Sequence, residues 1–309
     1  MRARRTGLIL TAAAGVAFAA VVARRSTRAP QPQVRTGTFS NGIEYSAVGG
    51  GPRTMIFLPG GPGTVPFAGI WARAGVGMFR LLAEAGFTVW RLSRRRDMPP
   101  GHTMADMADD VADVIDEGFG GHVDVVVGLS YGGPIALFLA ARHPDAVGRV
   151  ALVASSAAIT DKGRQLDRRF GEALADGRFT EAAEALLKEL LPPGRPQRGV
   201  TRLVAPLVGR VLAASGYNLP DVLVETRAEM DLDARPVLHQ ITAPVLIIAG
   251  DEDIFVTREI VEESARLIPD CTVVRYEGRS HGGTASDKRV PGDILAFVNR
   301  DSGLVRGSV

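Results

Sequence analysis

The chain has 309 residues, 46% of them hydrophobic, which is enough for a sizeable core in one large α/β domain with an insertion. Its formal net charge of +2 is close to balance, so the overall charge does not indicate a nucleic-acid partner. A single cysteine, Cys271, excludes an intramolecular disulfide and a cysteine-rich metal site.

The first residues form an apolar segment between clusters of arginine. Residues 6–23 carry no charge and are rich in Ala, Val and Leu. As a helix this run would span about 27 Å, close to the ~30 Å hydrocarbon core of a bilayer. We expect residues 1–25 to be a signal peptide or an N-terminal membrane anchor, with a buried helix of the fold as the third alternative. The protein would then lie in the cell envelope, secreted or membrane-anchored.

Residues 26–37 contain two prolines and two glutamines, a composition that predicts a linker. The folded domain is expected to begin at residue 38 with a hairpin that turns at Asn41-Gly42. A central strand over residues 54–58 follows and ends in the turn Pro59-Gly60-Gly61-Pro62-Gly63. Such a turn can present backbone N–H groups to an anion, which makes Gly61 a candidate oxyanion donor, with a plain loop as the alternative.

The next elements alternate between helix and strand. Residues 79–85 and 104–118 have helical patterns, and residues 87–92 between them form a predicted strand. Three consecutive arginines, Arg94 to Arg96, follow this strand. We interpret them as a solvated loop in preference to a clamp for an anionic substrate.

The pentapeptide Gly128-Leu129-Ser130-Tyr131-Gly132 joins an apolar run to an apolar helix. Residues 123–127 predict a buried strand, and residues 135–141 predict the helix. A strand that reverses into a helix over about five residues strains its central residue and excludes side chains from neighbouring positions, which explains the glycines. Ser130 is therefore a candidate nucleophile, and the backbone N–H of Tyr131 is a candidate oxyanion donor.

A second match to the same pattern spans residues 278–282, with Ser280 at its centre. The pattern alone is therefore weak evidence, and the structural context has to decide between the two serines. A polar stretch follows Ser280, whereas a long apolar helix follows Ser130. This difference favours Ser130.

A further strand is predicted over residues 149–154, after which the chain changes character. Residues 156–235 contain four helical patterns broken by prolines and glycines. A helical insertion into a chain of alternating strands and helices is typical of a lid. Its apolar positions, among them Leu203 and Leu207, either pack together or line a substrate cleft.

The alternation resumes with a buried strand at residues 244–249, which ends in Gly250-Asp251-Glu252-Asp253. A helix over residues 257–268, a strand over residues 272–276 and then His281 follow. Acidic residues just after the carboxyl end of a strand lie where α/β proteins place their sites. The order along the chain is therefore serine, acid, histidine.

With these residues, the chain resembles the α/β-hydrolase family over residues 38–300. The segment that ends at Asp253 is similar to the G-x-x-D acid loop of that family, which favours Asp253 over Asp251 as the triad acid; Asp251 could instead cap the turn. The segment from Leu58 to Gly63 is similar to the H-G-G-P-G turn of the proline iminopeptidase branch, with Pro59 in place of the histidine.

The resemblance implies an α/β-hydrolase fold, with a mostly parallel central sheet flanked by helices. Its core would comprise residues 38–155 and 236–303, with a helical lid at residues 156–235, after the sixth strand, and a tail at residues 304–309. The iminopeptidase branch typically has Gly and Trp around its serine, where this chain has Leu129 and Tyr131, which weakens that subfamily assignment.

The function implied is that of a serine hydrolase that cleaves a carboxylic ester through an acyl-enzyme. Its triad would be Ser130, His281 and Asp253, and Gly61 and Tyr131 would hold the oxyanion. Such a mechanism requires no metal and no cofactor. We expect the substrate to be a small molecule, a hydrophobic ester.

Two alternatives to an esterase stay open. One is an aminopeptidase of the proline iminopeptidase type, which would need acidic side chains such as Glu225 or Glu229 to bind the amine of its substrate. The other is a non-catalytic, ligand-binding member of the fold, although such a protein has no need of a complete triad.

Overall fold

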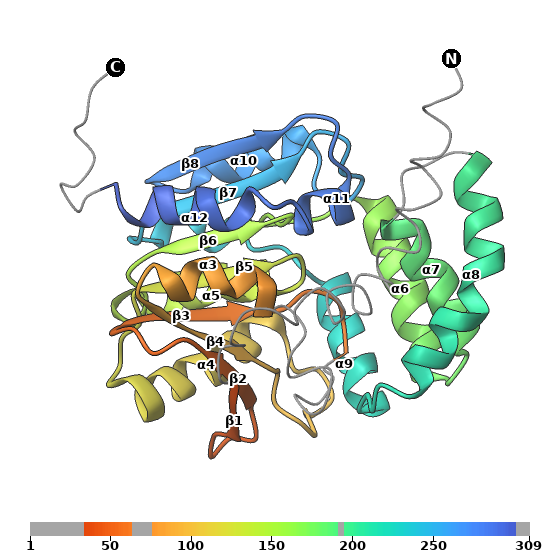
Figure 1. Cartoon of the computed structure of the whole chain (residues 1–309), viewed down its shortest axis with the longest axis horizontal. Helices are drawn as coiled ribbons and strands as arrows, with labels where there is room; N and C mark the ends of the chain where they lie inside the picture. The colour runs from red at the N-terminus through yellow and green to blue at the C-terminus, as the bar shows by residue number, and fades with distance from the viewer. Residues whose placement is uncertain (1–33, 64–75, 191–194, 301–309) are drawn as a thin grey trace.

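The computed structural model describes residues 34–63, 76–190 and 195–300 (Figure 1). The predicted signal or anchor, residues 1–25, and the predicted tail, residues 304–309, lie outside the described residues. Within the described ranges, no helix is long and apolar enough to cross a membrane.

The described residues form one eight-stranded sheet with the order β1-β2-β4-β3-β5-β6-β7-β8. β1 and β2 form an antiparallel hairpin, β2 pairs antiparallel with β4, and every further pair from β4 to β8 is parallel. The expected mostly parallel sheet is confirmed. The strands are β1 (Val34–Thr38), β2 (Glu44–Val48), β3 (Arg53–Leu58), β4 (Phe87–Leu92), β5 (Val125–Leu129), β6 (Val150–Val153), β7 (Val245–Gly250) and β8 (Cys271–Tyr276).

The first strand begins inside the segment predicted as a linker. β1 starts at Val34, which pairs with Val48 of β2, so residues 34–37 belong to the sheet and not to a linker. The composition of residues 26–37 does not contain the pairing with β2, so it placed the boundary too late.

Alternate residues of the central strands point to opposite faces of the sheet, and both faces are covered by helices (Figure 1). One face packs against α4 (Met104–Phe119), α5 (Gly132–Arg142) and α10 (Arg258–Leu267), and the other against α3 (Val76–Glu84) and α12 (Val290–Val298). The short elements are η1 (Pro144–Ala146), η2 (Arg235–Gln240) and α11 (His281–Ala285).

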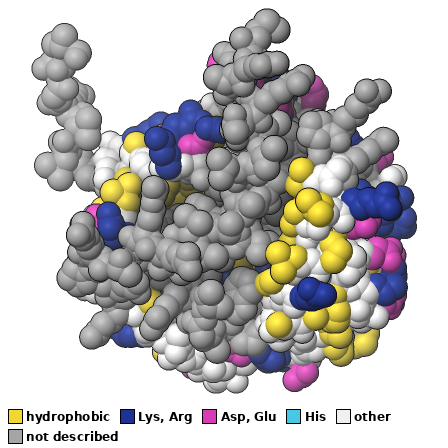
Figure 2. All heavy atoms as spheres, turned by 45° about the vertical axis from the view of Figure 1, so that its right-hand side comes forward, with side chains coloured by type: hydrophobic (Ala, Val, Ile, Leu, Met, Phe, Trp, Pro, Cys, Tyr) yellow, Lys and Arg dark blue, Asp and Glu magenta, His cyan; other side chains and the backbone are white. Residues whose placement is uncertain are grey.

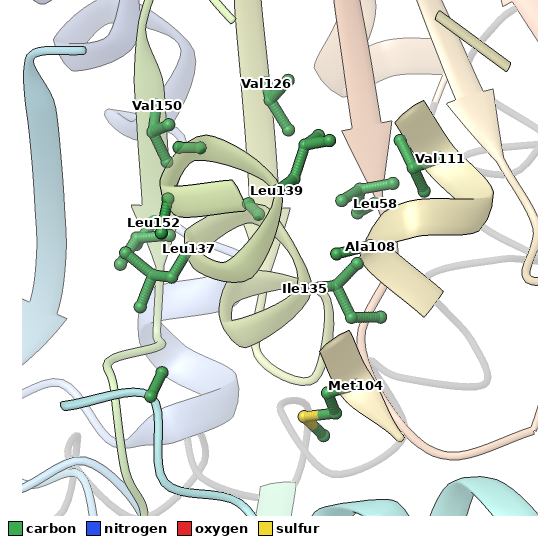
Figure 3. Packing of buried hydrophobic residues seen from close by; sticks show 14 of the residues in the cluster. Leu58, Met104, Ala108, Val111, Val126, Ile135, Leu137, Leu139, Val150 and Leu152 are labelled. Atoms are coloured by element: carbon green, nitrogen blue, oxygen red, sulfur yellow. The ribbon is translucent and has the colours of Figure 1, made fainter. Parts of the chain in front are cut away.

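Helix α5 is the centre of the first face. Nine of its residues are buried, because neighbouring elements surround it on nearly all sides. Figure 3 shows Ile135, Leu137 and Leu139 of this helix among side chains from the strands and from α4. The labelled partners are Leu58, Val126, Val150, Leu152, Met104, Ala108 and Val111. This packing fixes the start of α5, and with it the turn that contains Ser130.

Four described helices follow β6, the sixth strand, and gather at one side of the sheet (Figure 1). They have a small core of their own, centred on Phe170, Leu174 and Val208. Leu203 and Leu207 lie outside that core with 82% and 55% of their surface exposed. Figure 2, in which the side of the molecule that carries these helices is turned forward, shows a band of hydrophobic side chains. These helices are α6 (Asp161–Ala175), α7 (Phe179–Leu190), α8 (Arg195–Ala213) and α9 (Leu219–Met230).

Candidate active site

Ser130 occupies a strained turn between β5 and α5. Its backbone has a φ of 48°, in the left-handed region that residues other than glycine rarely adopt. Its N–H donates to the carbonyl of Val153, and its own carbonyl accepts from the N–H of Gly133 and the hydroxyl of Ser155. The hydrogen bonds on both sides of the residue hold this conformation, which presents the serine at the carboxyl end of the sheet.

The glycines around Ser130 stand where no side chain fits. A Cβ on Gly128 would lie 2.5 Å from the Cα of Gly133, and one on Gly132 would lie 2.2 Å from the carbonyl oxygen of Leu58. A Cβ on Gly133 would lie 2.0 Å from the hydroxyl of Ser155. The sequence argument that this turn excludes neighbouring side chains is confirmed, and it includes Gly133 at the first turn of the helix.

Three of the predicted site residues form one chain of hydrogen bonds. Oγ of Ser130 lies 2.9 Å from Nε2 of His281, and Nδ1 of the same imidazole lies 2.8 Å from Oδ2 of Asp253. His281 and Asp253 are both buried. The ring of Phe255 lies against the imidazole, with 4.7 Å between ring centroids. In this arrangement a histidine can accept the proton of a serine hydroxyl while a carboxylate fixes its tautomer.

Separate loops carry the acid and the histidine to this position. Asp253 follows β7, and its Oδ1 accepts hydrogen bonds from the N–H groups of Phe255 and Val256, which orient the carboxylate. His281 is the first residue of α11, whose N-cap is Ser280. The second serine of the repeated pattern, Ser280, is therefore a helix cap. Asp251 is exposed, and its carboxylate accepts a hydrogen bond from the N–H of Gly278, away from the imidazole.

The glycine-rich turn after β3 lies against the serine. A Cβ on Gly60 would lie 3.0 Å from Cβ of Ser130, and Gly61 has a φ of 73°, which favours glycine. Tyr131, the residue after the serine, has a buried side chain whose hydroxyl donates to the main-chain carbonyl of Glu225 in α9. Burial raises the pKa of this phenol well above its usual range, so it remains protonated.

Arg94 is a residue of this site that sequence reasoning missed. The interpretation of the three arginines as a solvated loop is wrong for Arg94, because it is 5% exposed and bonds to the carboxylate of Glu225 and to the turn after β3. Arg95 and Arg96 are more exposed and pair with Asp110 and with Glu44, respectively. The position of Arg94, just after the carboxyl end of a parallel strand, was the available signal.

A family model for the α/β hydrolase fold matches residues 53–283 of this chain. The chain belongs to the α/β hydrolase fold family. This α/β hydrolase is 27% identical over 215 residues to RutD of Yersinia enterocolitica, named as a carbamate hydrolase, covering 68% of this chain and 74% of that protein. It is 30% identical over 193 residues to the pimeloyl-acyl-carrier-protein methyl ester esterase of Neisseria meningitidis, covering 59% and 72%, respectively.

Among solved structures, a hydrolase from Pseudomonas aeruginosa PA01 superposes on this α/β hydrolase with a TM-score of 0.66. The sequences are 23% identical, and the superposition covers 86% of this chain and 98% of that one. This likeness supports the fold. Together with relatives that are named as hydrolases or esterases, the family match establishes the chain as an α/β hydrolase enzyme.

The described residues of the α/β hydrolase contain no group of three or more His, Cys, Asp and Glu side chains that could hold a metal ion.

The guanidinium of Arg94 lies over the ring of Tyr131 and pairs with the carboxylate of Glu225. Burial raises the pKa of the Glu225 carboxyl. Arg94 opposes this rise, because it lies in direct contact with that carboxylate.

Proposed function

We propose that this α/β hydrolase is a serine hydrolase that cleaves carboxylic esters through an acyl-enzyme. The observation that carries the proposal is the hydrogen-bonded chain from Ser130 through His281 to Asp253, with distances of 2.9 Å and 2.8 Å. The strained turn presents the serine, and the histidine, which the buried carboxylate orients, is the general base that activates its hydroxyl.

In the proposed reaction, Nε2 of His281 takes the proton of Ser130 while Oγ attacks the ester carbonyl. Asp253 holds the imidazole in the required tautomer and stabilises its charged form. The N–H groups of Gly61 and Tyr131 bind the developing oxyanion. His281 then gives its proton to the leaving alcohol, and the acyl-enzyme remains. Water, activated by the same histidine, attacks this intermediate and releases the acid.

We propose a small-molecule ester as the substrate. The relative that is named as a methyl ester esterase supports the ester bond in this proposal. The helices that follow β6 are proposed to cover this site as a lid. The cell-envelope location remains a proposal that rests on the predicted segment at residues 1–25.

The contacts of Glu225 disfavour the aminopeptidase alternative. This carboxylate is fully buried, and its Oε2 already accepts hydrogen bonds from Arg94 and from the N–H of Gly63. Its Oε1 makes no hydrogen bond with the described residues, but this atom is completely buried and so is not accessible to the amine of a peptide in this structure. The complete hydrogen-bonded chain at Ser130 likewise disfavours a purely ligand-binding protein, because binding alone does not require it.

Labelling of the full-length protein with a fluorophosphonate, followed by mass spectrometry, tests the proposal. We expect the label on Ser130, its loss in Ser130→Ala and His281→Ala, and loss of p-nitrophenyl acetate hydrolysis in the same variants. Ser286→Ala, which changes an exposed serine in the loop after α11, serves as the matched control and should label normally. Protein that is folded by circular dichroism yet unlabelled, or hydrolysis that survives Ser130→Ala, would contradict the proposal.

A further inference from the structure

A buried ion pair joins the core of the enzyme to the helices that follow β6. Nε of Arg94, just after β4, donates to Oε2 of Glu225 in α9 at 2.7 Å, although the two residues are 131 positions apart. The side chains are 6% and 0% exposed, respectively. Burying two charges is costly, and such pairs often stabilise a fold less than apolar side chains of similar volume would. The pair therefore calls for an explanation other than stability.

The same two side chains hold the glycine-rich turn beside Ser130. Arg94 donates from Nη1 to the carbonyl of Pro59 at 3.2 Å and from Nη2 to the carbonyl of Gly61 at 2.7 Å. Oε2 of Glu225 accepts from the N–H of Gly63 at 2.6 Å. These bonds fix the peptide groups 59–60, 61–62 and 62–63. The remaining peptide group of the turn, 60–61, carries the N–H that we propose as an oxyanion donor, and fixed peptide groups lie on both sides of it.

Contacts with the same two residues, one of them through the main chain of Glu225, also hold the second proposed oxyanion donor. The guanidinium carbon of Arg94 lies 4.8 Å from the ring centroid of Tyr131, and the hydroxyl of Tyr131 donates to the main-chain carbonyl of Glu225 at 2.9 Å. Helix α9 is attached to the core a second time, because the carboxylate of Asp221 accepts from the N–H groups of residues 97 and 98. These contacts make α9 a fixed wall of the site.

We propose that Arg94 and Glu225 are positioning residues that set the oxyanion donors of Gly61 and Tyr131 against Ser130. In this proposal α9 belongs to the catalytic framework, and any movement of the lid involves α6, α7 and α8. This inference rests on the proposed function, since it concerns the oxyanion donors of that reaction. Stabilisation of an oxyanion depends steeply on donor position, so a loosened turn should slow the chemical step while leaving substrate binding nearly unchanged.

The test compares Arg94→Met, Glu225→Gln and the double variant in the full-length protein. Active sites are titrated with a fluorophosphonate, and kcat for p-nitrophenyl acetate is expressed per titrated site. We expect kcat to fall about 100-fold in each single variant and no further in the double variant, with KM within about twofold of the wild type. The double variant removes both charges of this pair, so it is expected to fold even if a single variant does not.

The neighbouring pair Arg96 and Glu44 provides the matched control. It joins the same arginine run to β2 in a more exposed setting, so Arg96→Met and Glu44→Gln should leave kcat within about twofold of the wild type. A role of the Arg94 pair in folding alone would reduce the titratable fraction and leave kcat per site unchanged. That result, or losses that multiply in the double variant, would overturn the proposal.

Amide hydrogen exchange provides a readout that does not depend on hydrolysis. In the double variant, the peptide that contains residues 59–63 should exchange at least about tenfold faster than in the wild type, while the peptide that contains β7 is unchanged. Unchanged exchange at residues 59–63 would exclude the positioning role even if the enzyme is a serine hydrolase. Faster exchange, combined with no fluorophosphonate label on the wild type, would support the role of Arg94 and Glu225 in holding residues 59–63 and would reject the proposed function.

Discussion

The carboxylate of Asp251 accepts a hydrogen bond from the main-chain N–H of Gly278 at 2.6 Å, and so ties the loop after β7 to the loop after β8. Asp253, two residues later, turns to the inside of the same loop, where its carboxylate contacts His281. The two acids therefore have separable roles. Asp251 connects the loops that carry the acid and the histidine, and Asp253 contacts the imidazole itself.

Asp253→Asn should inactivate the enzyme far more than Asp251→Asn. The asparagine Oδ1 is expected to stay with the N–H groups of Phe255 and Val256, which turns its NH₂ group towards Nδ1 of His281. Nδ1 must then accept, which places the proton on Nε2 and prevents it from taking the proton of Ser130. We expect a loss of kcat of about 10⁴-fold.

The matched variant Asp251→Asn keeps an oxygen that can accept from Gly278, so its kcat should change by no more than about twofold. Ester hydrolysis at saturating substrate, compared between the two variants, provides the measurement. Equal losses in both variants would show that the assignment of the triad acid is wrong.

Gly132→Ala should impair both stability and activity. The new Cβ would lie 2.2 Å from the carbonyl oxygen of Leu58, a backbone atom at the end of β3 that can move only with the turn beyond it. We expect a loss of about 1–3 kcal/mol in the free energy of unfolding. A displacement of the turn by about 1 Å would also lower kcat by about 100-fold.

Gly292→Ala is the control for the glycine substitution. Gly292 lies in α12, is exposed, and has no atom within 4 Å of an added Cβ, so alanine should stabilise the protein by about 0.4–1 kcal/mol. Urea denaturation of both variants, followed by circular dichroism, measures the difference. A Gly132→Ala variant as stable and active as the wild type would contradict the account of the turn at Ser130.

The parts of the structure that could be predicted depend on contacts close in the sequence. The apolar strand before Ser130, the glycines around it and the helix after it form one local pattern, and that pattern determined the turn. The alternation of strands and helices likewise indicated the sheet, since a parallel pair requires a crossover and the crossovers are visible as helical patterns.

The parts that could not be predicted depend on contacts between distant segments. Arg94 resembles Arg95 and Arg96 in sequence, and only the position of Glu225, far along the chain, separates the buried arginine from the two more exposed ones. The start of β1 was missed for the same reason. Val34 is extended because it pairs with Val48, and the composition around residue 34 does not contain that information.

Cys271 should be almost unreactive in the folded enzyme. Burial, and to a smaller extent the nearby charge of Asp270, raises the pKa of its thiol to about 12. At pH 8 the thiolate fraction would be roughly a thousandfold lower than that of a free cysteine, and the thiolate is the reactive form. Iodoacetamide should therefore modify the protein only after unfolding in guanidinium, as measured by intact mass. Rapid alkylation of the native protein would disprove this expectation.

Asp287 should make the stability of the protein depend on pH in the acid range. Hydrogen bonds from the Arg289 side chain, with further help from its backbone N–H and from Arg279, lower the pKa of this carboxyl from 3.8 to about 2. Because the pKa is lower in the folded state, the stabilisation is complete above the unfolded value of 3.8 and is lost as the pH falls towards about 2.

Asp287→Asn should therefore cost about 1 kcal/mol at pH 7, a modest value because both arginines are partly exposed. The difference in Tm between this variant and the wild type should be constant from pH 7 to pH 5 and should shrink below pH 4. Asp145→Asn, at an exposed position after α5, is the control and should show neither effect. Differential scanning calorimetry across this pH range measures both variants. A Tm difference that stays the same down to pH 3 would mean that the Asp287 carboxylate does not contribute through its charge.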